Sequence, residues 1–260
     1  MAASLAGKHC AVVGGTGVIG ASIARAFAWR GAVTSVLGRR ALQLRGEIEP
    51  LLRPYEPLPP PSPWHHRPEL SRHRFIKLDV SQRESIKDVF ASEITETSVG
   101  PVDILVNCAG ISQTTLLKRT PDAEVSKIVD TNLLATMLVS KHAKMRPHGC
   151  IINVSSLMAT KGAIGATAYA ASKAGVVGFT RALCLEMSAR SIRVNALLPG
   201  WVQSEMWENL KQDLKDSYLK DTPLGRVATP EEVAEAVIFL AANEFANNCV
   251  LNLDGGLSAS

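Results

Sequence analysis

The chain has 260 residues, 46% of them hydrophobic and 20% charged, which is ordinary for a globular protein and long enough for one α/β domain with a substantial core. No apolar run approaches the ~18 residues of a membrane-spanning helix, and the net charge of +4 forms no basic stripe of the kind that binds nucleic acid. The five cysteines are widely spaced without a C-x-x-C pair, so we expect reduced core residues rather than disulfides or zinc ligands.

A glycine-rich turn follows the first predicted strand. Residues 9–13 are apolar, glycines occupy positions 14, 15, 17 and 20, and residues 21–30 have helical character before Gly31. A strand, a glycine turn and a helix in this order are typical of dinucleotide sites, because glycines let the backbone approach a pyrophosphate that the helix N-terminus stabilises. We therefore expect a dinucleotide at this turn.

The second predicted strand, residues 33–37, ends in Gly38, Arg39 and Arg40. NAD-selective folds place an acidic residue near this point, where it binds the ribose 2′-hydroxyl. A guanidinium instead pairs with the 2′-phosphate of NADP. The two arginines could simply begin the next helix, but their position favours NADPH, with Arg39 as the first candidate.

Residues 50–68 hold eight of the fourteen prolines, which excludes a continuous helix and predicts an extended insertion. His65, His66 and His73 lie in or near this stretch, but no cysteine or ligand spacing supports them. We expect no metal site there, and interpret the insertion as a flap near the adenosine end of a bound nucleotide.

Further strands are predicted at residues 74–80, 102–106, 150–154, 192–198 and 250–254, separated by helical segments. Three helix starts carry capping signals: Ser81 with Glu84, Thr120 before Pro121, and Thr229 before Pro230. The first of these helices is expected to reach about residue 97. Alternating strands and helices without repeats or linkers predict one Rossmann-type domain over residues 1–260, a doubly wound parallel α/β sheet in three αβα layers.

The chemistry centres on Ser156, Tyr169 and Lys173. Residues four apart share one face of a helix, so Tyr169 and Lys173 should point the same way. A nearby ammonium favours the phenolate, so we expect it to lower the tyrosine pKa from its usual ~10 and make the phenol a proton donor or acceptor near neutral pH. The Ser156 hydroxyl could hold a substrate oxygen beside that phenol.

A Tyr-x-x-x-Lys pair alone has little weight, but here it accompanies the glycine turn, Ser156, and the Asn-Cys-Ala-Gly sequence at 107–110. In this combination the chain resembles the short-chain dehydrogenase/reductase family along nearly its whole length. It looks most similar to the branch of 3-oxoacyl-carrier-protein reductases and carbonyl reductases. The chain departs from the family pattern in having Val18 at the fifth position of the glycine loop and Cys108 in place of a second asparagine.

The resemblance implies the roles of individual residues. The catalytic set would be Asn132, Ser156, Tyr169 and Lys173. The cofactor-binding residues would be Gly14, Thr16, Gly17, Ile19, Gly20, Arg39, Arg40, Asp79, Val80, Asn107, Ala109, Gly110, Tyr169, Lys173, Pro199, Gly200, Val202 and Ser204. Asn132 would bend its helix and hold a water that feeds protons to Lys173, and residues 203–221 would form a lid over the substrate.

The implied activity is NADPH-dependent reduction of a ketone to an alcohol, first of all of a 3-oxoacyl thioester in fatty-acid biosynthesis. The alternatives are a carbonyl reductase of a free ketone, such as a quinone, steroid or polyketide intermediate, and a non-catalytic cofactor-binding subunit. An acidic acyl carrier protein is the expected partner of the first, with Lys141, Lys144, Arg146 and Arg190 as candidate contacts beside the cleft. Relatives are usually tetramers. Residues 1–9 look like neither a signal nor a transit peptide, so cytosol or mitochondrial matrix is expected.

Overall fold

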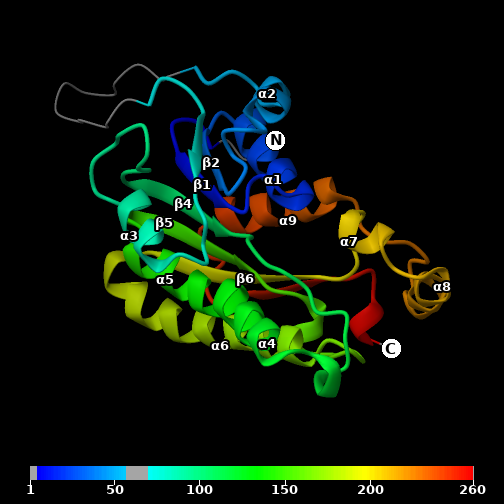
Figure 1. Ribbon diagram of the computed structural model, residues 1–260. Helices are drawn as coiled ribbons and strands as arrows, with labels where there is room; N and C mark the ends of the chain where they lie inside the picture. Colours follow the sequence, from blue (N-terminus) through cyan, green and yellow to red (C-terminus); the bar gives the residue numbers. More distant parts are fainter. Residues whose placement is uncertain (1–4, 57–69, 260) are drawn as a thin grey trace.

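The computed structural model describes residues 5–56 and 70–259. In this part of the chain, seven strands form one sheet in the order β3-β2-β1-β4-β5-β6-β7, with every neighbouring pair parallel (Figure 1). The strands are β1 His9–Val13, β2 Val33–Gly38, β3 Arg74–Lys77, β4 Val102–Asn107, β5 Met145–Val154, β6 Arg193–Pro199 and β7 Val250–Leu253. The chain winds outward from β1 in one direction and returns to β4 to wind in the other, which confirms the predicted doubly wound fold.

Helices cover both faces of the sheet. They are α1 Val18–Trp29, α2 Arg45–Ile48, α3 Arg83–Val89, α4 Asp122–Val129, α5 Ala135–His142, α6 Thr167–Met187, α7 Glu205–Glu208, α8 Gln212–Asp221 and α9 Pro230–Ala242. All five residues of β1 are buried: Cys10 and Val12 join the core under α1 and α9, whereas Ala11 and Val13 join the core under α3, α5 and α6. A strand buried on both faces needs apolar residues at successive positions, and residues 9–13 have this pattern.

Of the three predicted helix caps, one is correct. Thr229 accepts a hydrogen bond from the backbone N–H of Glu232, whose carboxylate accepts from Thr229 N–H, so the predicted capping box opens α9. Ser81 caps nothing, because its hydroxyl donates to Asp79 Oδ1 at 2.8 Å, and α3 begins after Gln82 and ends at Val89, well short of residue 97.

The prediction for Thr120 was also wrong. The N-cap of α4 is Pro121, and the Thr120 hydroxyl is engaged with groups of the preceding loop, including the backbone oxygen of Leu116 at 3.0 Å. Thr120 is thus a residue of the loop rather than of the helix, and its partners there become important for the site described below.

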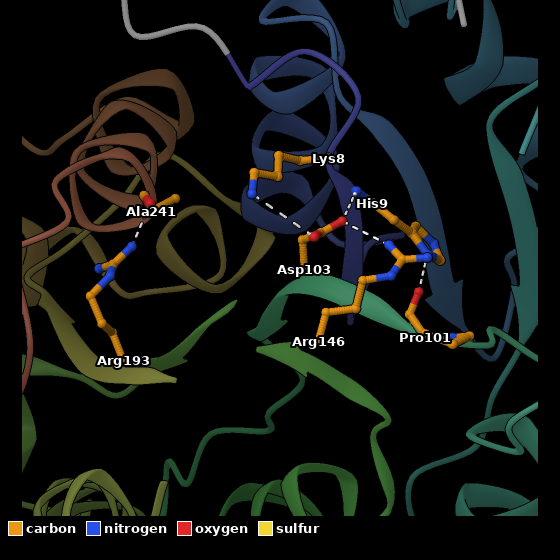
Figure 2. Close-up of polar contacts among 7 residues, drawn as sticks. All are labelled: Lys8, His9, Pro101, Asp103, Arg146, Arg193 and Ala241. Atoms are coloured by element: carbon orange, nitrogen blue, oxygen red, sulfur yellow. Dashed lines mark hydrogen bonds and ion pairs between the residues drawn. The ribbon is translucent and has the colours of Figure 1, made fainter. Parts of the chain in front are cut away.

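A buried polar cluster closes the amino end of the sheet (Figure 2). The Asp103 carboxylate accepts from the backbone N–H of His9 at 2.8 Å and from the Arg146 guanidinium at 2.9 Å. The His9 ring lies 2.9 Å from the backbone oxygen of Pro101 and 2.8 Å from Ser35 Oγ, and burial lowers its pKa to about 4. The neutral ring thus bridges the starts of neighbouring strands.

This placement corrects the predicted contacts to an acyl carrier. Lys141 lies in the last turn of α5 and Lys144 directly before β5, Arg146 pairs with Asp103, and the Arg190 guanidinium donates to the backbone oxygen of Met145. All four belong to the amino end of the sheet, whereas the sites of parallel α/β sheets lie at the carboxyl end. Sequence proximity to catalytic elements was misleading because β5 carries the chain across the whole sheet.

The proline-rich insertion and its neighbouring histidines are only partly described. Residues 57–68, with His65 and His66, lie outside the described residues. The His73 ring is a buried connector: its Nδ1 accepts from Thr34 N–H at 3.1 Å and its Nε2 lies 2.7 Å from the backbone oxygen of Arg53. Within residues 5–56 and 70–259 no group of His, Cys, Asp and Glu could hold a metal ion. Over the same ranges, no helix has the length and apolar character required to cross a bilayer.

Candidate active site

Four loops meet at the carboxyl end of the parallel sheet. The glycine turn follows β1, residues 107–110 end β4, Ser156 comes two residues after β5, and Gly200 follows β6. Because all strands run in the same direction, these segments share one edge. The sequence-predicted residues therefore come from separate parts of the chain to one region of the molecule.

The glycine turn has the geometry of a phosphate cradle. Gly14 has φ of +81°, and a Cβ there would lie 2.6 Å from the backbone nitrogen of Ala109. A Cβ on Gly20 would overlap the Gly14 carbonyl, so both positions require glycine for the fold itself. A Cβ on Gly17 would meet only Gly14 O, at 3.5 Å. Gly17 is the N-cap of α1, whose first turn carries no acidic side chain, so this open space lies at an unneutralised helix N-terminus suited to an anion.

Basic residues stand where the ribose of a nucleotide at this turn would be expected. Arg39 and Arg40 are exposed directly after β2. Asp79 and Val80 follow β3, the neighbour of β2, and the charge of Arg39 contributes to holding the Asp79 pKa below its usual value, after hydrogen bonds from Ser81. The side chains predicted for the adenosine end are therefore grouped at the ends of two adjacent strands.

The 107–110 segment connects β4 to neighbouring elements. The Asn107 amide is buried and donates to Asn153 Oδ1 at 2.8 Å and to Ser140 Oγ at 3.1 Å, so its side chain ties β4 to β5 and α5. Gly110 lies beside two of the candidate catalytic residues: a Cβ there would lie 3.2 Å from Asn132 Oδ1 and 3.4 Å from Lys173 Nζ. The small residue lets these two polar groups approach the loop.

Ser156, Tyr169 and Lys173 are brought together as predicted. Tyr169 and Lys173 lie one turn apart on α6, with Lys173 Nζ 5.8 Å from the centroid of the Tyr169 ring. The Ser156 hydroxyl is near enough to the Tyr169 phenol to lower the pKa of that phenol. Lys173 is only 4% exposed, and its ammonium donates to the backbone oxygen of Val154 at 2.9 Å. A half-buried phenol, a buried hydroxyl and a buried ammonium thus lie close together at this edge of the sheet.

The expected pKa shift of the phenol is not found in this arrangement. Burial raises the pKa of Tyr169, and the hydrogen bond with Ser156 only partly opposes this. Burial likewise lowers the pKa of Lys173, to about 8. The prediction considered the attraction between phenolate and ammonium but not the cost of removing each charge from water, which is the larger effect for both groups. Tyr169 is therefore protonated at neutral pH, in the state of an acid.

Asn132 lies in a π-helical turn, Asp130–Leu134, between α4 and α5. Its side chain is fully buried: Oδ1 accepts from Ile111 N–H at 2.8 Å, and Nδ2 donates to the Ile111 oxygen at 2.9 Å and to Ser172 Oγ at 3.1 Å. The wide turn is the helix distortion expected here, and π-turns are frequent at functional sites. Asn132 connects the loop after β4 to the catalytic helix α6.

The segment after β6 leads into the predicted lid. A Cβ on Gly200 would lie 2.9 Å from Asp254 Cα, and the Ser204 hydroxyl accepts from Trp207 N–H at 3.4 Å as the N-cap of α7. Helices α7 and α8 project from the body of the molecule (Figure 1). The rings of Trp201 and Tyr218 lie 4.7 Å apart, which attaches α8 to this loop.

A hollow of about 520 Å³ lies beside α7 and α9, lined by residues including Gln203, Trp207 and Arg226. It contains none of Ser156, Tyr169 or Lys173, so it is separate from the candidate catalytic residues.

Two buried residues at the site escaped sequence reasoning. Gln113 accepts hydrogen bonds from the first turn of α6, and Ser172 donates to the backbone oxygen of Tyr169 at 2.7 Å. The one available signal was that Ala166, before α6, offers no capping side chain, so the helix needed an acceptor from elsewhere.

Comparison with known proteins gives consistent results over nearly the whole chain. The profile of a family described as Enoyl-(Acyl carrier protein) reductase matches residues 65–258. The chain is 35% identical over 261 residues to 3-oxoacyl-[acyl-carrier-protein] reductase FabG of Chlamydia muridarum, with 98% of each chain covered. It is also 35% identical over 254 residues to carbonyl reductase family member 4 of Xenopus tropicalis, covering 96% of this chain and 98% of that protein. A solved structure of a short-chain dehydrogenase/reductase mutant from Serratia marcescens superposes with a TM-score of 0.83 at 26% identity, covering 98% and 99% of the two chains.

Proposed function

The chain belongs to the short-chain dehydrogenase/reductase family and is an oxidoreductase with a nicotinamide cofactor, and from this premise we propose that it reduces a 3-oxoacyl thioester to the 3-hydroxyacyl thioester with NADPH. The observation that carries the proposal is the half-buried, protonated Tyr169, which lies one turn from Lys173 and whose pKa Ser156 influences. In that state the phenol is ready to give a proton to a carbonyl oxygen.

The four polar residues divide the work. Ser156 holds the carbonyl oxygen by a hydrogen bond, and Tyr169 transfers its proton to that oxygen as the carbonyl carbon is reduced. The Lys173 ammonium stabilises the negative charge left on the phenol, in a pocket where burial strengthens the interaction. Asn132 contacts Ile111 and Ser172 and so holds the wide helical turn beside Lys173. The proton that Tyr169 gives up would be replaced from the side of Lys173.

The bound cofactor supplies the hydride. The 14–20 turn and the N-terminus of α1 would hold its pyrophosphate, since the space above Gly17 is open and the helix end bears no acid. Arg39, with Arg40 beside it, would pair with the 2′-phosphate that distinguishes NADPH from NADH. Asp79 and Val80 would line the adenine, and Pro199, Gly200, Val202 and Ser204 would border the nicotinamide.

The substrate assignment rests on relatives that cover almost the full chain and carry the name 3-oxoacyl-[acyl-carrier-protein] reductase. An acyl carrier protein is acidic, so its docking surface should be basic and lie at the carboxyl end of the sheet. Lys118 and Arg119, exposed in the short 3-10 helix Leu117–Arg119 that follows the Gly110 loop, replace the four residues at the opposite end as candidates. Assembly as a tetramer, and residence in cytosol or mitochondrial matrix, follow the family and are part of the same proposal.

The second candidate, reduction of a free ketone, is favoured by the equal identity to a carbonyl reductase. Steady-state oxidation of NADPH with an acetoacetyl carrier thioester, compared with menadione, separates the two. We expect the thioester to have the higher kcat/KM, and the reverse order would assign the protein to free ketones.

Tyr169→Phe tests the proton donor itself. It should lower kcat by at least ~10² while leaving NADPH binding intact, because only the proton donor is removed. Binding of NADPH by the wild type without turnover of a broad ketone panel would instead identify a non-catalytic subunit.

A further inference from the structure

The helix that carries the catalytic pair is capped by a residue from a distant loop. Ala166, at the N-cap of α6, has no side chain that can accept a hydrogen bond, and the first turn contains no acidic residue. The first N–H groups of a helix have no intrahelical acceptor. Gln113 Oε1 fills this role, accepting from Ala168 N–H at 2.8 Å and from Tyr169 N–H at 3.3 Å.

The other half of the same amide is also fully engaged. Gln113 Nε2 donates to the Thr115 backbone oxygen at 2.9 Å and to Thr120 Oγ1 at 3.1 Å, and the residue is only 6% exposed. A buried amide with its acceptor and both donors satisfied cannot shift without leaving a polar group unpaired. Gln113 therefore fixes α6 rigidly to the loop that extends from the Gly110 turn.

The peptide groups of Tyr169 are held on both sides. Its N–H meets Gln113, and its carbonyl accepts from Ser172 Oγ at 2.7 Å, which in turn accepts from Asn132 Nδ2 at 3.1 Å. The Ser172–Asn132 side belongs to the catalytic set and its helix. The Gln113 side is an independent attachment that reaches α6 from another segment of the chain.

We propose that Gln113 is a positioning residue for the reaction: it fixes the backbone of Tyr169 so that the phenol stays in hydrogen-bonding range of Ser156 and of the carbonyl oxygen to be protonated. This inference rests on the proposed function, because it assigns Gln113 a role through Tyr169. Proton transfer is sensitive to such placement, and a displacement of about 1 Å can cost ~10²-fold in rate.

The test is a kinetic cycle with matched variants. Gln113→Met has a similar length but no acceptor, Gln113→Glu keeps an acceptor for the two N–H groups, and Thr114→Val changes an exposed threonine of the same loop. We expect Gln113→Met to lower kcat by ~10- to 100-fold with NADPH affinity unchanged, Gln113→Glu to lower it less, and Thr114→Val to retain the wild-type kcat.

The same Gln113→Met change is then made in the Tyr169→Phe background. A residue that acts through the phenol should have no further effect on the residual rate there, because effects of groups that work as a unit do not add. An equal loss in both backgrounds, or a wild-type kcat for Gln113→Met, would overturn the inference. If Tyr169→Phe itself kept the wild-type rate, the proposed function would fail first, and the two failures are thus distinguishable.

Discussion

We expect the buried Lys173 to lower the free energy of unfolding. It is 4% exposed, its ammonium makes a hydrogen bond with the Val154 oxygen, and burial lowers its pKa from 10.5 to about 8. A folded-state pKa below the unfolded value means that folding disfavours the charged form. Below pH 8 both states carry the proton, so the whole penalty is present, and the shift corresponds to about 3 kcal/mol.

Lys173→Met keeps most of the apolar stem and removes the charge. Removing the charge removes the burial penalty of about 3 kcal/mol. Losing the hydrogen bond to Val154 destabilises the fold by about 1–2 kcal/mol and so offsets part of this gain. The variant should therefore be more stable than the wild type at pH 7 by about 1–2 kcal/mol, while losing the reductase activity that needs the ammonium. Urea unfolding followed by circular dichroism measures the difference.

The pH dependence of this difference is the sharper test. Between pH 7 and 9 the folded wild type releases the Lys173 proton and the unfolded chain does not, so the wild type gains about 1 kcal/mol that the variant cannot gain. The Cys108 thiol nearby, with a pKa raised by burial to about 11, stays protonated in the folded state over this range. The stability gap should narrow accordingly. A gap that is the same at both pH values would refute the reasoning from burial.

Three further predictions concern the cofactor and the opposite end of the sheet. Arg39→Asp should weaken NADPH much more than NADH in fluorescence titrations, and equal losses would remove our account of cofactor choice. Gly17→Ala should leave the melting temperature nearly unchanged and weaken NADPH binding, whereas Gly20→Ala should destabilise the fold because its Cβ would overlap the Gly14 carbonyl; the reverse pattern would contradict the cradle. His9 has a folded-state pKa of about 4, below the usual 6.5, so up to about 3 kcal/mol of stability should be lost as pH falls from 6.5 to 4, and a His9→Gln variant with the same acid sensitivity would show that another group is responsible.

Sequence patterns predicted those features that depend on short-range or strictly periodic signals. The strand, glycine turn and helix at residues 9–29 follow from apolar runs and from glycines that the backbone needs. The capping box at Thr229 was correct because its two partners lie three residues apart and have no competitor nearby. The caps expected at Ser81 and Thr120 failed because other groups orient both hydroxyls. Ser81 Oγ donates to Asp79, whereas Thr120 Oγ1 donates to the Leu116 oxygen and accepts from Gln113 Nε2.

Burial and long-range contacts at the site could not be predicted from the sequence. The pKa values of Tyr169 and Lys173 depend on desolvation, which spacing on a helix does not reveal. Gln113 lies 55 positions before Ala168, whose N–H it accepts, and a loop glutamine has no pattern that marks it as a cap. Arg146, only ten residues before Ser156 in the sequence, lies at the start of β5, whereas Ser156 follows its end.

The two ends of the sheet serve separate purposes, and this has a consequence for how such a chain can change. The cluster of His9, Asp103 and Arg146 contributes to holding the framework, while the candidate catalytic residues and the projecting helices α7 and α8 lie toward the opposite end. We therefore expect substitutions at the amino end of the sheet to change stability without changing turnover. Substitutions at the carboxyl end should change substrate preference without destabilising the fold. Stability and substrate preference would then evolve through residues at opposite ends of the same strands.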